Sequence, residues 1–143
     1  MDKVLEYHDL KKYVPHRYPF LLIDRVLDYE INKSIKGIKN ISPYEPYLKK
    51  GDRTFYPIGL IMESIGQLAG ILFSLSSGNA RSKKVLIGSF SDVSIKGQVT
   101  VGNQLYIEVN IIKAMDNSFI AEGRAQCAKE EVLSIKQLIV IIK

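Results

Sequence analysis

The stretch that decides the fold is PIGLIMESIGQLAGILF, residues 57–73. Proline is favoured at the first position of a helix and glycine just past its end, and Pro57 and Gly78 stand at these places. The apolar side chains of this helix point to all of its sides, so no face is polar enough to meet water, and such a helix is buried. We therefore predict a buried helix over about residues 58–76.

One carboxylate and one amide interrupt this apolar helix. Glu63 and Gln67 are one turn apart and share a face, and Gly66 and Gly70 thin the same side. A carboxylate on a core helix needs an explanation, because burying it is costly unless it is satisfied. Either a loop amide satisfies a structural glutamate, or Glu63 has a chemical role. At this point both interpretations stay open.

The rest of the chain reads as strands and loops around that helix. A short amphipathic helix is expected within residues 2–14, and Pro43 and Pro46 keep 39–56 a loop. Later segments alternate apolar and polar residues, as half-buried strands do. This order predicts an α+β fold with one helix against a curved antiparallel sheet. The expected strands cover residues 21–30, 34–41, 85–91, 93–100, 105–114, 118–128 and 132–142.

The composition bounds the class of protein. The length of 143 residues predicts one domain over residues 1–143. The net charge of +5 is mildly basic and gives no indication of nucleic-acid binding. The basic residues flank the central helix on both sides, either as solvated loops or as a rim that attracts an acidic partner. This basic rim consists of Lys49, Lys50, Arg53, Arg81, Lys83 and Lys84.

The single cysteine, Cys127, allows no internal disulfide and fits a reducing cytosol, where we expect it as a packed thiol. The N-terminus lacks the pattern of a signal peptide, so a cytoplasmic location is expected. The central helix is near the minimum length for a membrane span. Glu63, Ser64 and Gln67 in its middle favour a core helix instead of a span.

Four motifs carry a family resemblance over nearly the whole chain. They are HRYPFLLIDRV at 16–26, IKNISPYEPY at 38–47, ESIGQLAG at 63–70 and VGNQL at 101–105. In this order they resemble the 3-hydroxyacyl-acyl-carrier-protein dehydratases of fatty-acid synthesis, the FabZ type. The resemblance implies a hotdog fold, in which the sheet wraps round the central helix. It also implies a homodimer, possibly a trimer of dimers, with the site at the dimer interface and an acyl carrier protein or coenzyme A thioester as substrate.

Dehydration of such a thioester requires a base, an acid and donors for the enolate oxygen. Glu63 is the expected acid, at the inner end of an apolar tunnel, with a pKa raised by desolvation. The free N–H groups of Ile58 and Gly59 at the helix start could bind the oxygen. Gln67 could hold a water or the Glu63 carboxyl. The chain lacks the residue patterns of a metal site or a phosphate loop, and no cofactor is expected.

One departure from the family affects the expected base. The family places its catalytic histidine in a Gly-His-Phe-Pro-Gly loop before the helix, whereas the corresponding interval, LKKGDRTFYP at 48–57, contains no histidine. The only histidines are His8 and His16, and in the family the histidine of the first motif is not the catalytic one. Asp52 is a weak base at neutral pH. Tyr56 could donate a proton or orient a carbonyl, or simply pack against the helix start.

Three functions therefore stay open. The chain could be a dehydratase with weak or altered catalysis. It could be a hotdog subunit that binds acyl thioesters without turnover, possibly beside an active paralogue. It could also be a hotdog thioesterase that uses Glu63 to activate water.

Overall fold

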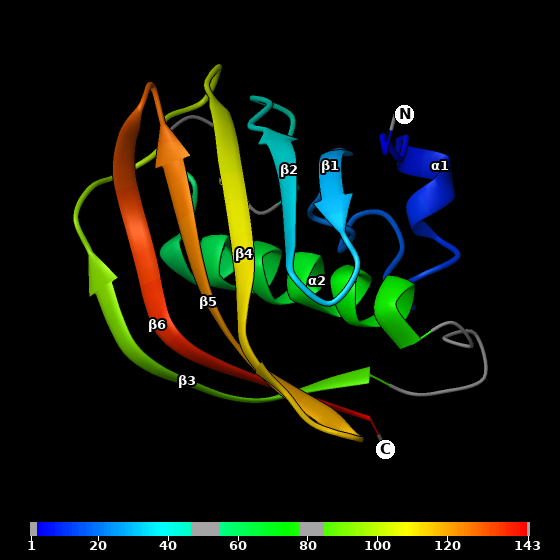
Figure 1. The fold of residues 1–143 in the computed structure, drawn as a ribbon. Coiled ribbons are helices and arrows are strands. Elements are labelled where there is room, and N and C mark those ends of the chain that lie inside the picture. Colours follow the sequence, from blue (N-terminus) through cyan, green and yellow to red (C-terminus); the bar gives the residue numbers. More distant parts are fainter. Residues whose placement is uncertain (1–2, 47–54, 78–84, 143) are drawn as a thin grey trace.

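The computed structural model describes residues 3–46, 55–77 and 85–142. A curved antiparallel sheet lies across one long helix, and the chain that precedes residue 25 runs beside that helix (Figure 1). This is the predicted α+β hotdog arrangement. The elements are α1 (Tyr7–Leu10), β1 (Arg25–Glu30), β2 (Ser34–Asn40), α2 (Ile58–Ser77), β3 (Val85–Ile95), β4 (Gln104–Ala114), β5 (Ser118–Cys127) and β6 (Glu130–Ile142).

The sheet has six strands in the order β1-β2-β4-β5-β6-β3, and all neighbours are antiparallel. Only β4, β5 and β6 form a meander, because β3 pairs with β6 at the far edge and the chain then crosses back to place β4 beside β2. We expected separate strands over 85–91 and 93–100, but β3 is continuous over Val85–Ile95. Asp92 takes a positive φ of 54° within it, a conformation that aspartate tolerates.

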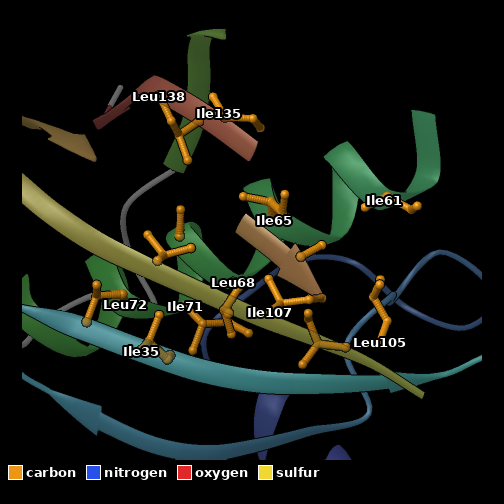
Figure 2. Packing of buried hydrophobic residues seen from close by; sticks show 14 of the residues in the cluster. Ile35, Ile61, Ile65, Leu68, Ile71, Leu72, Leu105, Ile107, Ile135 and Leu138 are labelled. Carbon is orange, nitrogen blue, oxygen red and sulfur yellow. The ribbon is translucent and has the colours of Figure 1, made fainter. Parts of the chain in front are cut away.

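The core lies between α2 and the inner face of the sheet. Figure 2 shows Ile65 and Leu68 of α2 among side chains from the strands, including Ile107 of β4 and Leu138 of β6. A Cβ on Gly123 of β5 would lie 2.5 Å from Ile65, so only glycine allows the helix this close to the sheet. The apolar faces thus determine how α2 is seated.

The glycine at position 66 has a different role from the one expected. A Cβ there would lie 3.3 Å from Ile87 and 3.6 Å from Phe90, both on β3. Gly66 therefore lets β3 approach the helix and does not open a gap beside Glu63. By length and composition α2 could cross a membrane, but 67% of its most apolar window is buried, which is typical of a core helix.

Candidate active site

Three polar residues of α2, Glu63, Gln67 and Ser74, contact one segment of chain, residues 13–22, which we call the N-terminal segment. Pro15 and Pro19 interrupt regular structure in it, so its backbone groups need partners outside a helix or sheet. Gln67, which is only 2% exposed, supplies two of them. Its Oε1 accepts the Leu22 N–H at 2.7 Å, and its Nε2 donates to the Phe20 carbonyl at 2.7 Å.

Further contacts hold the same segment along the helix. Ser74, two turns beyond Gln67, donates its hydroxyl to the Tyr13 carbonyl at 2.8 Å. Within the segment, Arg17 donates to the carbonyls of Val14 at 2.9 Å and His16 at 2.8 Å. The backbone around His16 is therefore fixed on both sides, and its imidazole is directed towards α2.

The imidazole of His16 meets the carboxylate of Glu63. His16 Nε2 lies 3.5 Å from Glu63 Oε1, and the two side chains are 34% and 46% exposed, respectively. Gln67 Nε2 donates to the same Oε1 at 3.3 Å, as the one-turn spacing allowed. An acid–base pair from two distant parts of the chain is thus present at the surface of α2.

The protonation expected for Glu63 was wrong. The hydrogen bond from His16 lowers the pKa of Glu63 below its ordinary value, helped by Gln67 and by the charge of His16, and this outweighs desolvation, which would raise it. In the isolated chain the Glu63 side chain is half exposed, and the apolar tunnel expected around it at a dimer interface stays a prediction. Near neutral pH the group is a carboxylate, which argues against the general acid predicted for it.

The family motif predicts no catalytic role for His16. The number of histidines could have identified it, because the chain has only two. The other, His8, lies 3.3 Å from Asp9 in α1. The Nδ1 of His16 is buried and has no hydrogen-bond partner among the described residues. Of the two ring nitrogens, Nε2 is therefore the one that contacts Glu63.

The positions of the other predicted site residues do not by themselves indicate a chemical role. Tyr56 is 1% exposed and belongs to the core, and its N–H donates to Val99 at 2.8 Å. Ile58 and Gly59 form the first turn of α2, and a Cβ at Gly59 would meet nothing within 4 Å among the described residues. Both polar atoms of the Gln67 amide, Oε1 and Nε2, already form hydrogen bonds within the chain. Catalytic and binding roles for these residues stay predictions.

Several expectations fall outside the described residues. They concern Asp52 and the basic rim of Lys49, Lys50, Arg53, Arg81, Lys83 and Lys84. Within the part that is described, no three histidine, cysteine or carboxylate side chains group closely enough to hold a metal ion. Cys127 is a free thiol, half-buried at the end of β5.

Comparison with known proteins places this arrangement in a family. The model of the FabA-like domain matches residues 14–136, which include both His16 and Glu63. The chain belongs to the FabA-like family. Among its relatives is the 3-hydroxyacyl-[acyl-carrier-protein] dehydratase FabZ of Coxiella burnetii, which is 37% identical over 93% of this chain and 98% of its own length. FabZ of Rickettsia felis is 37% identical over 76% of each chain.

A solved structure shares the fold of this FabA-like chain. It is a chain of the dehydratase heterocomplex ApeI:P from Xenorhabdus doucetiae, with a TM-score of 0.79 over 94% of this chain and 90% of that one. The sequence identity is only 17%, so this likeness concerns the hotdog fold alone. The FabZ-type resemblance found in the motifs is confirmed at the level of the family.

Proposed function

We propose that this chain acts on 3-hydroxyacyl thioesters of acyl carrier protein, in fatty-acid or related acyl-chain biosynthesis, with weak or altered elimination. The FabZ relatives support the substrate class. The observation that carries the proposal is the Glu63 carboxylate on α2, in contact with an imidazole and open to solvent. Elimination requires proton acceptors and donors of this kind next to the thioester.

The start of α2 supports the same chemistry. The first N–H groups of a helix have no partner within it, and they favour developing negative charge. Ile58 and Gly59 supply such groups about one turn before Glu63. A thioester carbonyl placed there would have its enolate oxygen stabilised while the neighbouring carbon faces the carboxylate.

Altered catalysis follows from the interval between Pro46 and Pro57. It contains no histidine, whereas the resemblance puts the family's base there. Loss of a positioned general base costs about 10²–10⁴-fold in rate. We therefore expect turnover well below that of an ordinary dehydratase, with the chain retaining the capacity to bind the acyl thioester.

Partners are proposed on the same grounds. A homodimer, possibly a trimer of dimers, would cover part of the exposed surface beside Glu63, as the family resemblance implies. The basic rim would attract acidic acyl carrier protein or the phosphates of coenzyme A in the cytoplasm. Light scattering at micromolar concentration tests the assembly, and a stable monomer would contradict it.

A thioesterase is the second candidate, because the lowered pKa of Glu63 keeps a carboxylate available to activate water. Mass spectrometry of the protein mixed with 3-hydroxyacyl and enoyl thioesters of acyl carrier protein separates the candidates. Slow interconversion of the two thioesters supports the proposal, and free carrier thiol indicates hydrolysis. Tight binding without either leaves the binding subunit, and absence of binding and turnover overturns all three.

A further inference from the structure

We propose that His16 and Glu63 of one chain form the proton-transfer pair of the altered elimination, with Glu63 accepting the proton from C2 and His16 donating one to the departing 3-hydroxyl. This inference rests on the proposed function and specifies its chemistry. It assigns Glu63 as the acceptor and takes the donor from the N-terminal segment.

The two oxygens of Glu63 are used unequally. Oε1 is contacted both by His16 Nε2 at 3.5 Å and by Gln67 Nε2 at 3.3 Å. Oε2 accepts no hydrogen bond from the described residues, and the Glu63 side chain is 46% exposed. One oxygen thus orients the carboxylate while the other is available to take a proton. Because its pKa is lowered, Glu63 is a weak base, as Asp52 would be, and this is consistent with the slow elimination proposed above.

The two nitrogens of His16 are also unequal. Nδ1 is buried, so it cannot meet a substrate in this arrangement. Nε2 lies beside the carboxylate, on a side chain that is 34% exposed. The fixed backbone of residues 14–17 keeps the ring there, because Arg17 holds the carbonyls of Val14 and His16. The nitrogen that can donate a proton is therefore the one next to the acceptor.

The spacing of the pair fits the substrate. The C2 proton and the C3 oxygen are on adjacent carbons, so the groups that exchange protons with them must themselves be neighbours. Glu63 Oε2 takes the C2 proton, and the electrons of that bond form the C2–C3 double bond. The C3–O bond breaks with its electrons on oxygen, which receives a proton from His16 Nε2 and leaves as water.

The contact also resets the pair. After one turnover Glu63 holds a proton on Oε2 and His16 lacks one on Nε2. Nε2 lies 3.5 Å from Oε1 of the same carboxyl group, so one water that contacts both side chains would return the proton. The hydrogen bond that lowers the pKa of Glu63 favours this direction of transfer. No second chain is needed for either proton step.

A substrate whose leaving group needs no proton separates the two roles. We would compare 3-hydroxybutanoyl and 3-chlorobutanoyl thioesters of acyl carrier protein, with the rate lacking protein subtracted. The variants are Glu63→Gln, His16→Gln and, as matched control, His8→Gln, whose histidine is exposed and lies next to Asp9. Circular dichroism of each variant checks that it folds.

We expect Glu63→Gln to lose elimination from both substrates, by about 10²–10⁴-fold for loss of a base. His16→Gln should lose water elimination but retain most of the chloride loss, and His8→Gln should match the wild type. Chloride loss that survives Glu63→Gln, or water loss that survives His16→Gln, overturns the assignment. Wild-type protein that binds both thioesters without turnover overturns the pair but leaves the binding function, whereas absence of binding overturns the proposed function itself.

Discussion

The two sides of α2 are held by different kinds of interaction. Its sheet side is a continuous apolar surface, on which Ile65, Leu68 and Leu72 are fully buried. Its other side carries Glu63, Gln67 and Ser74, and each of these contacts the N-terminal segment through a hydrogen bond or an ion pair. Burial of apolar area is non-directional, whereas hydrogen bonds require particular atoms at particular distances.

The difference separates stability from placement. Apolar packing tolerates changes that conserve volume, so many sequences can seat a helix under a curved sheet. On the polar side, these hydrogen bonds act together with the burial of Val14 and Leu21 to fix where His16 lies relative to Glu63. Changes on the sheet side should therefore alter the stability of the whole molecule, and changes on the polar side should alter the site.

The largest effect is expected on the sheet side. Leu68→Ala removes a fully buried side chain whose Cδ1 lies against β2, 3.0 Å from where a Cβ on Gly37 would be. Such a cavity costs about 2–5 kcal/mol in free energy of unfolding. Urea denaturation measures it, with Met62→Ala on a half-buried position of α2 as the control. Equal losses for both variants would show that the core does not lie where the burial pattern puts it.

A smaller effect is expected from the polar side. Gln67→Met keeps the volume but removes the acceptor of the buried Leu22 N–H. Leaving such a donor unsatisfied costs about 1–3 kcal/mol. Hydrogen exchange at the Leu22 amide should speed up more than at amides of β5, because the N-terminal segment is released first. Gln137→Met, the same change at an exposed position of β6, is the control, and equal effects would contradict the role of Gln67.

These two sides also differ in how far they could be predicted. The helix over 58–77, its burial and most strands followed from local patterns, because apolar periodicity depends on neighbouring residues. The single strand through Asp92 did not, since a positive φ within a strand leaves no periodic signal. The pKa of Glu63 was predicted in the wrong direction. The apolar residues around it in the sequence indicate desolvation, but they give no indication of a contact with a histidine 47 positions away.

The last prediction concerns that pKa and has the smallest expected effect. The pKa of Glu63 is lowered on folding, so the carboxylate stabilises the native state above its ordinary pKa of 4.5 and loses this contribution as pH falls through the lower folded value. Wild type should therefore exceed Glu63→Gln in stability near neutral pH, by no more than about 1 kcal/mol for a half-exposed pair. The difference should shrink below pH 4.5.

Thermal unfolding from pH 7 to pH 3 measures this difference in stability, and Glu122→Gln, at an exposed position of β5, serves as the control. A gap that widens on acidification would mean that Glu63 is raised in pKa after all. Glu63 would then be the proton donor first expected at this position. Desolvation, as on the apolar side of α2, would then affect its pKa more than the contacts with His16 and Gln67 do.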